Sequence, residues 1–254
     1  MLLRRLTLHV KVQNWFAVGI DFVIVVVGVF IGIQVANWND SRAFKARELE
    51  LLVELKSEIE DAIQLSNNRG HGYAQAAAAG KRTLLFLASD TPCDSDCWPV
   101  LVDFMHASQW QGMSIPRTTY DEMRRLGLPS ARSIVEAVEA FYAQNQQIVQ
   151  AMIDKPAYRS LVRQMIPVEA QESYWTNCHQ LIDGYESYAL DCPRGVSDDV
   201  AKSAVTTIIN HPQIQLSLTE WAGDVTAVPG DLDAQVRAGE RAMAAIDNVL
   251  VAHN

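Results

Sequence analysis

The apolar residues of the chain are concentrated in one long segment near the N-terminus. This segment reads WFAVGIDFVIVVVGVFIGIQVANW from Trp15 to Trp38, and Asp21 is its only formally charged residue. As a helix it reaches roughly 30 Å at about 1.5 Å per residue, which matches the hydrocarbon core of a bilayer. The two flanking Trp residues suit the headgroup regions. The pattern predicts a transmembrane helix over 15–38, preceded by a short basic tail over 1–14.

A cleavable signal peptide is the first alternative to a transmembrane helix. The apolar region of such a peptide is shorter, roughly 7–15 residues, and ends at a small-x-small cleavage site. Here the apolar run ends in QVANW at residues 34–38, which fits a cleavage site poorly. We therefore expect an uncleaved signal anchor that crosses the membrane once.

Beyond the apolar segment, apolar residues recur at helical spacing. No Pro occurs before Pro92, and no Gly occurs between Gly32 and Gly70, so we expect the membrane helix to continue outward. Four residues form a stripe on this continuation: Leu52, Leu55, Ile59 and Ala62. The favoured interpretation is that the stripe packs on later helices of the same chain. A coiled coil between subunits is the alternative, but two or three turns are too few to prefer it.

The rest of the chain also has the spacing of helices. One helix is expected to follow Ser130 as its cap, and another to follow Ser197. The first of these carries an apolar face: Ile134, Val138, Phe141, Ile148 and Met152. Further helices are expected over 73–89, 98–108, 168–190 and 231–251. Loops are expected near 90–97, 112–116, 127–129, 191–197 and 223–230. Strand alternation is not sustained, so the sequence predicts an all-α bundle over 39–254 as one folded unit.

Composition and charge narrow the class of protein. Hydrophobic residues make up 49% of the chain and charged residues 20%, as in a globular protein. The net charge is −9; residues 1–47 carry +4, so the remainder carries −13. An acidic domain disfavours nucleic-acid binding through a basic face, and none is expected. The lipid bilayer is the first expected partner.

The cysteines indicate which side of the membrane the bundle occupies. Basic residues do not decide this, because three lie on each side of the apolar segment: Arg4, Arg5 and Lys11 before it, and Arg42, Lys45 and Arg47 after it. Four cysteines follow the segment: Cys93, Cys97, Cys178 and Cys192. An even number suggests disulfides, and the usual two-residue spacing of zinc ligands is missing. Of the three possible pairings we prefer Cys93–Cys97 with Cys178–Cys192, because each closes a local loop.

Oxidised cysteines imply an exported bundle. We expect the N-terminus in the cytoplasm and residues 39–254 outside it. If the source is a Gram-negative bacterium, the chain sits in the inner membrane with a periplasmic domain.

One side of the apolar helix combines an acid with small residues. Asp21, Gly28 and Gly32 share this side, and Gly28 and Gly32 form a GxxxG pattern that permits close helix packing in lipid. A carboxylate at the depth of Asp21 costs roughly 2–3 kcal/mol unless it is paired, protonated or hydrated. Asp21 either moves protons or cations through a partner or, as we favour, pairs at the interface with Lys11 or a neighbouring subunit. A second membrane protein or a second copy is therefore an expected partner.

The segment GIDFVIVVVGVFIGIQVANWNDSR resembles the opening of a bacterial family of single-pass membrane proteins that is known as a domain of unknown function. In that family the helix has an early acidic residue and ends in Gln-x-x-Asn-Trp-Asn, matched here by Gln34, Asn37, Trp38 and Asn39. Many relatives carry Glu where this chain has Asp21. A weaker likeness covers TTYDEMRRLGLPSARSIVEAVEAFY at 118–142. The resemblance implies the fold and a membrane location, and no activity.

The chain lacks the common catalytic motifs. It contains no HExxH, no GxSxG and no phosphate-binding Gly loop, so no catalytic residue, metal or cofactor is expected. Tyr120, Asp121 and Glu122 follow a Pro loop and are a candidate ligand or partner contact. The favoured alternative is that Tyr120 packs in the core while the carboxylates cap a helix.

Several aromatic residues are a second candidate contact. They could line a ligand pocket, although aromatic residues at helical spacing are more often core: Trp110, Tyr174, Trp175, Tyr185 and Tyr188.

The sequence thus predicts a membrane-anchored, non-enzymatic interaction or ligand-sensing module with a periplasmic helical domain. The alternative is an accessory subunit of a proton- or ion-driven membrane complex that uses Asp21. An enzyme with an unrecognised site is a third possibility.

Overall fold

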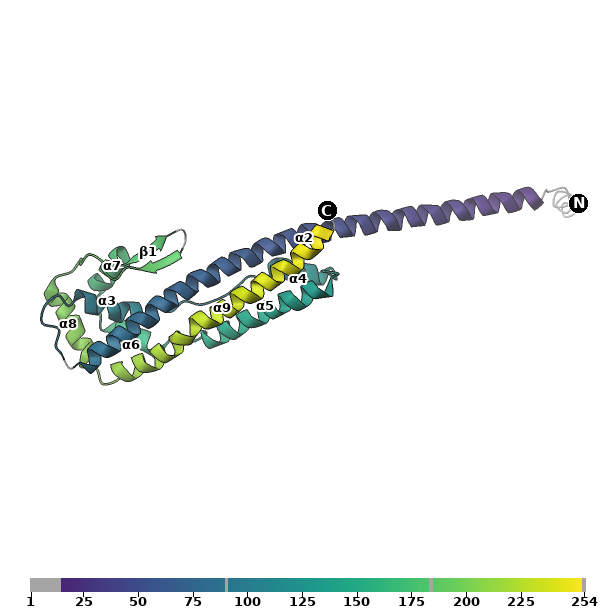
Figure 1. The fold of residues 1–254 in the computed structure, drawn as a ribbon. Coiled ribbons are helices and arrows are strands. Elements are labelled where there is room, and N and C mark those ends of the chain that lie inside the picture. Colours follow the sequence, from purple (N-terminus) through teal and green to yellow (C-terminus); the bar gives the residue numbers. More distant parts are fainter. Residues whose placement is uncertain (1–14, 90, 183–184, 253–254) are drawn as a thin grey trace, which may run out of the picture. The chain divides into compact units, whose positions relative to one another are not determined.

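Helices dominate the fold, as the sequence predicts (Figure 1). A computed structural model describes residues 15–89, 91–182 and 185–252. Within these ranges the chain forms eight helices and one two-stranded sheet. The all-α prediction is confirmed, with a short hairpin that was not expected.

Helix α2 runs without interruption from Trp15 to Ala88 over 74 residues. The predicted continuation of the apolar helix is therefore confirmed. The chain divides into two compact units, 1–51 and 52–254, which are described separately.

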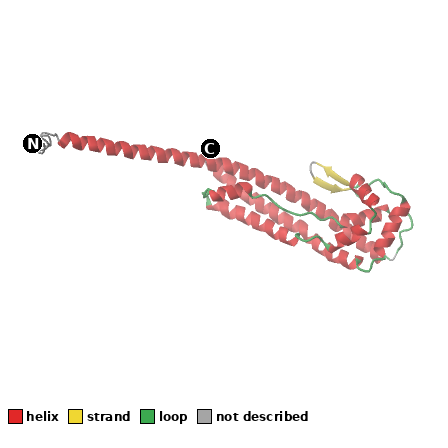
Figure 2. Ribbon diagram, turned by 180° about the vertical axis from the view of Figure 1, so that it is seen from behind, coloured by secondary structure: helices red, strands yellow, loops and turns green. Residues whose placement is uncertain are grey.

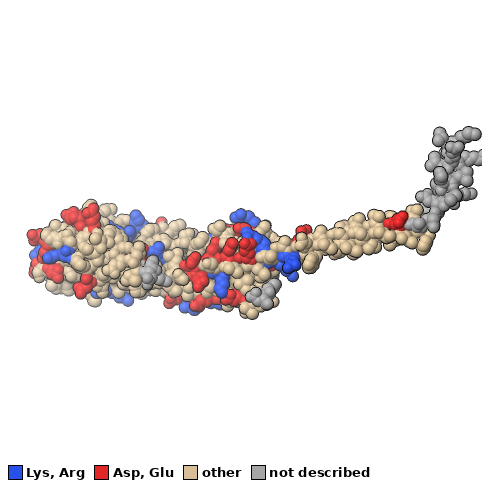
Figure 3. Space-filling model, turned by 90° about the horizontal axis from the view of Figure 1, so that it is seen from above, with Lys and Arg blue, Asp and Glu red and all other residues tan. Residues whose placement is uncertain are grey.

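In the first unit, α2 is apolar and uncovered. An 18-residue stretch of it has a mean hydropathy of 2.5, and none of that stretch is buried. By length and composition this is the one described stretch suited to crossing a membrane. Figure 3 shows how few charged side chains the N-terminal part of α2 carries, compared with the second unit, residues 52–254, which we call the helical unit.

In the second unit, α2 packs antiparallel to the long C-terminal helix α9, Ile214–Ala252. Lys56 Nζ lies 2.6 Å from Asp247 Oδ1 near one end of this contact. Near the other end, a Cβ on Gly80 would lie 3.3 Å from that of Ala222. The stripe that begins at Leu52 is buried, as predicted for packing within the chain: Leu52, Leu55, Ile59 and Ala62. Helix α5, Arg132–Ala151, also packs on α9 through its predicted apolar face.

The remaining elements lie toward the end of the unit where α2 finishes and α9 begins, apart from α4 near the C-terminus (Figures 1 and 2). They are α3 Trp98–Ala107, α4 Thr118–Arg125, α6 Ala157–Gln164, α7 Val168–Asn177, β1 His179–Ile182, β2 Tyr185–Tyr188 and α8 Asp198–Ile209. The strands are antiparallel, with His179 opposite Tyr188.

Two predicted boundaries are wrong. The helix expected over 168–190 ends at Asn177 and gives way to the hairpin, which Cys178 and Cys192 bracket and close by a disulfide. The loop expected near 223–230 is helical, because α9 continues through Pro229. Burial of Val225 and Leu232 on either side of this proline favours continuity despite the lost backbone hydrogen bond.

One of the two predicted helix caps is confirmed. Ser197 Oγ accepts a hydrogen bond from the Val200 backbone N–H, as expected for the cap of α8. The Ser130 prediction is wrong: α5 begins after Ala131, without a side-chain cap.

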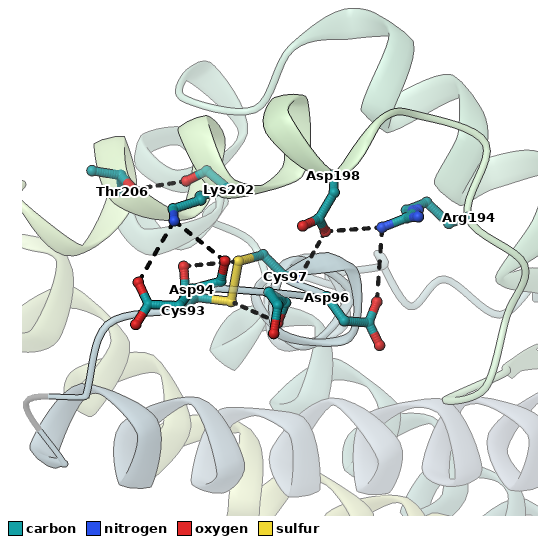
Figure 4. Close-up of a disulfide and its surroundings, with 9 residues drawn as sticks. Cys93, Asp94, Asp96, Cys97, Arg194, Asp198, Lys202 and Thr206 are labelled. Atoms are coloured by element: carbon teal, nitrogen blue, oxygen red, sulfur yellow. Dashed lines mark hydrogen bonds and ion pairs between the residues drawn. A yellow bond between two sulfur atoms is a disulfide. The ribbon is translucent and has the colours of Figure 1, made fainter.

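Both predicted disulfides are present, Cys93–Cys97 and Cys178–Cys192. Figure 4 shows how ion pairs hold the first one against α8. The backbone N–H of Cys97 donates to Asp198, whose carboxylate also pairs with Arg194. Asp96 also pairs with Arg194, and Asp94 pairs with Lys202 of α8. The disulfide and these ion pairs together hold the 93–97 loop against α8.

Candidate ligand-binding site

The predicted residues of the apolar helix lie on an uncovered surface of α2. The side chains of Asp21, Gln34, Asn37, Trp38 and Asn39 are all exposed. The glycines of the GxxxG pattern are uncovered too: no described atom lies within 4 Å of a Cβ added at either position, Gly28 or Gly32. The arrangement leaves this helix free to meet lipid or another helix.

The predicted contact at Tyr120, Asp121 and Glu122 does not form one accessible group of side chains. Tyr120 is fully buried, and its hydroxyl donates to Glu139 Oε1 at 3.0 Å. Burial and this carboxylate raise the pKa of Tyr120 to about 12. Asp121 is exposed and lies 3.4 Å from the Arg117 guanidinium, whereas Glu122 is half-buried.

The aromatic residues, in contrast, gather where α3, α7 and the hairpin meet. The ring of His106 lies 5.3 Å from the rings of both Tyr174 and Tyr188. Trp175 packs edge-on against Tyr174, also at 5.3 Å. The side chain of Tyr185 lies outside the described residues. The structure thus brings together three of the five aromatic residues named from the sequence, and the other described one, Trp110, lies beside Tyr188 in a pocket wall.

The pocket beside Trp110 and Tyr188 is small, and we call it the chamber. Its volume is about 10 Å³, which is room for one water-sized group. Its walls come from α2, the segment after α3 and β2: Arg69, Gly72, Tyr73, Gln109, Trp110, Gln111 and Tyr188.

A larger and mostly apolar depression adjoins the chamber, and we call it the groove. Its volume is about 450 Å³, and it shares Arg69 and Trp110 with the chamber. The other walls are Leu65, Gly112, Met113, Ser114, Val149, Met152 and Ile153. The two depressions together offer a polar end and an apolar trough.

Hydrogen bonds between side chains and backbone fix the polar end. The Tyr73 hydroxyl donates to the Gln111 carbonyl at 2.5 Å and accepts from the Gln111 backbone N–H at 2.9 Å. The Gln111 amide donates to the Tyr188 hydroxyl at 3.2 Å, and that hydroxyl donates to Glu186 at 2.8 Å. Burial raises the pKa of Tyr73 to about 12, and burial and Glu186 raise the pKa of Tyr188 further. Both phenols therefore remain neutral at physiological pH.

Three guanidinium groups surround this network, and only one carboxylate accompanies them. Arg69 Nη1 lies 3.4 Å from Glu186 Oε1. Arg159 donates to the Ser108 carbonyl at 2.8 Å, and Arg163 donates to the Ser108 hydroxyl at 2.9 Å. Among the described residues, no carboxylate lies within ion-pair distance of Arg159 or Arg163. Burial, and then the charge of Arg159, lower the pKa of Arg163 to about 10, so it stays charged at neutral pH.

Several buried donors here have no acceptor in the described part of the chain. They are Arg69 Nε, Trp110 Nε1 and Arg163 Nη2. A buried donor without an acceptor costs about 1–3 kcal/mol. Two of the three belong to residues that line both the chamber and the groove. Positive charge and unmet donors at the end of an apolar trough favour binding of a group that carries negatively charged oxygen.

The arginines were missed by the sequence analysis. Arg159 and Arg163 are four residues apart on α6, beside the buried Tyr158 and Val162, and this spacing is the signal that places them on a half-buried face. Arg69 offers no comparable signal, because its neighbours in the site are distant in sequence.

No family model matches the chain, and no curated protein or solved structure matches it either. The likeness of the N-terminal segment to a family of single-pass proteins therefore stays a resemblance.

Proposed function

We propose that the protein is a membrane-anchored, non-enzymatic binding module whose helical unit lies outside the cytoplasm. The observation that carries this proposal is the uncovered apolar stretch of α2. Phe22 is 69% exposed and Phe30 60%, on a stretch whose mean hydropathy is 2.5. Continuous apolar surface of this extent is unfavourable in water and favourable in a bilayer.

The two disulfides support an oxidising compartment for the helical unit. With the N-terminus in the cytoplasm, residues 39–254 lie in the periplasm of a Gram-negative bacterium, and α2 crosses the inner membrane.

The walls of the site favour binding over catalysis. The described residues that line the chamber and the groove are mostly aromatic, aliphatic and amide side chains, with Ser114 as the one serine among them. The unmet N–H donors and apolar walls are features of a ligand-binding pocket.

Membrane fractionation of the producing cells tests the anchoring. We expect the full chain to remain in the pellet after washes with high salt and with alkaline carbonate. Protease added to intact spheroplasts is expected to degrade the helical unit, with a cytoplasmic protein as the control for lysis. A chain released by the salt wash would overturn the anchoring, and a helical unit protected from protease would overturn the orientation.

A second candidate function is an accessory subunit of a proton- or ion-driven complex. The observation that favours it is the exposed carboxylate of Asp21 within the apolar stretch, on the side that carries Gly28 and Gly32. The test is complementation of a deletion strain by Asp21→Asn, with Asp40→Asn, outside the apolar stretch, as the matched control. Loss of complementation by Asp21→Asn alone, at normal protein level, would support this function. Full complementation would remove it.

A further inference from the structure

We propose that the groove and the chamber bind an amphipathic carboxylate, with the carboxylate at Arg69 and Trp110 and the apolar chain along the groove. This assignment names a ligand class for the module and so rests on the proposed binding function. It does not depend on the anchoring or on the orientation in the membrane.

The polar end is suited to one carboxylate. Arg69 Nε and Trp110 Nε1 are buried N–H donors that lack an acceptor among the described residues, and both residues line both depressions. In the proposed complex a carboxylate oxygen accepts from both donors, while Nη1 of the same Arg69 guanidinium keeps its ion pair with Glu186. Arg159 and Arg163 add positive charge that no described carboxylate balances at ion-pair distance.

The chamber has room for one oxygen of the ligand. At about 10 Å³ it accommodates one water-sized group. A carboxylate places one oxygen there, and its second oxygen lies on the open side, toward the groove. We therefore assign a carboxylate as the polar group of the ligand.

The groove accounts for the apolar part of the ligand. Its volume of about 450 Å³ lies within the range of small-molecule sites. Met113 and Met152 form part of its wall, and their unbranched side chains adapt to flexible chains. Burial of each methylene group strengthens binding roughly fourfold, so affinity is expected to rise with chain length until the groove is filled.

Decanoate is the probe, and the full chain in nanodiscs is the sample. Isothermal titration at pH 8, with empty nanodiscs subtracted, is expected to show saturable decanoate binding. Octanoate is expected to bind roughly tenfold to twentyfold more weakly, because it lacks two methylene groups. Decanol, which has the same chain without the charge, is expected to bind at least tenfold more weakly.

Variants locate the site. Arg69→Gln is expected to weaken decanoate binding at least tenfold, and Trp110→Phe severalfold. Ile153→Trp, at an exposed position of the groove wall, is expected to narrow the groove and to weaken decanoate binding at least tenfold. Arg132→Gln and Trp38→Phe are the matched controls, since neither residue lines the chamber or the groove and both are exposed. Circular dichroism establishes that each variant is folded before it is titrated.

Three outcomes would overturn the assignment. They are no saturable binding of decanoate to the unaltered chain, equal binding of decanol, and unchanged binding by folded Arg69→Gln and Ile153→Trp. A chain that stays in the membrane and fails to bind decanoate loses only the ligand assignment. A chain that binds decanoate but is extracted by salt loses only the anchoring.

Discussion

The two parts of helix α2 share one backbone structure and differ in everything their side chains touch. From 16 to 46, every side chain that the structure describes is exposed, although most are apolar. From Leu52 onward, apolar residues are confined to a stripe, and Leu52, Leu55 and Ile59 are 0% exposed. An apolar surface all round a helix suits lipid, and a stripe suits protein. The spacing of apolar residues, rather than helix propensity, therefore identifies the medium that each part occupies.

The test with the largest expected effect places one charge in each of the two parts of α2. Leu55→Asp buries an unpaired carboxylate in the core and is expected to lower the free energy of unfolding by more than about 4 kcal/mol. Val26→Asp lies on the uncovered stretch and is expected to leave that free energy unchanged while reducing membrane insertion. Thermal unfolding followed by circular dichroism and carbonate extraction measure the two effects.

The opposite pattern would break the comparison. If Val26→Asp destabilises the helical unit, the apolar stretch packs on protein. If Leu55→Asp leaves stability intact, the stripe is not part of the core.

The disulfides provide the next test, because all four cysteines belong to the helical unit. Replacing both Cys178 and Cys192 by Ala is expected to lower the free energy of unfolding by about 3 kcal/mol, since this bond closes the longer loop. The same change at Cys93 and Cys97 is expected to cost about 2 kcal/mol. Urea unfolding measures both, and neither variant is expected to leave the membrane fraction. Equal stability of the three proteins would contradict the structural role of these bonds.

Two glycine substitutions, one in the helical unit and one in the apolar stretch of α2, test the same comparison through smaller changes in the free energy of unfolding. A Cβ at Gly239 would lie 2.8 Å from Ile63 Cγ1 and 3.2 Å from a ring carbon of Phe141, so Gly239→Ala forces the core to shift. We expect a loss of about 1–3 kcal/mol in the free energy of unfolding. Gly32→Ala meets no described atom within 4 Å and is the matched control, expected to leave stability unchanged. A destabilising Gly32→Ala would show that another helix covers this face.

The sequence predicts most of the long-helix packing because local pattern and burial agree there. The stripe from Leu52, the apolar face of α5 and the cap at Ser197 each depend on spacing along a single helix. The failures occur where tertiary contacts outweigh local preference. Pro229 lies within α9 because buried valines and leucines on both sides hold the helix together. The hairpin was missed although Asp183-Gly184, a dipeptide typical of two-residue hairpin turns, separates its strands in the sequence.

The candidate site was predictable only in part. The aromatic residues Tyr174 and Tyr188 were predictable as a candidate contact, because large aromatic side chains at helical spacing form either core or the lining of a pocket. Arg69, Trp110 and Tyr188 come from distant positions, and only the packing of α2, the segment after α3 and the hairpin brings them to one chamber. A buried donor without an acceptor, such as Arg69 Nε, arises only when the chain is folded, so no sequence pattern predicts it.

The smallest expected effect concerns pH and the buried ring of His106. Burial, and then the charge of Arg82, lower the pKa of His106 to about 4 from its ordinary 6.5, while a hydrogen bond to the Cys178 carbonyl opposes the shift. The rings of Tyr174 and Tyr188 also face it. Above pH 6.5 the ring is neutral in both the folded and the unfolded chain, so it adds no pH dependence. Between pH 6.5 and 4 only the unfolded chain takes up the proton, so stability falls as the pH falls.

At pH 5.5 the expected loss from this residue is about 1 kcal/mol relative to pH 7.5. His106→Gln removes the titrating ring, and the difference in unfolding free energy between the two proteins is expected to change by that amount over this interval. Urea unfolding at both pH values measures it, and the comparison cancels the carboxylates that titrate in both proteins. His71→Gln, at an exposed position of α2, is the control for replacing a histidine by glutamine outside the core. A constant difference between the unaltered chain and His106→Gln would mean that His106 titrates normally, and the packed aromatic cluster behind the chamber would then have to be open to water.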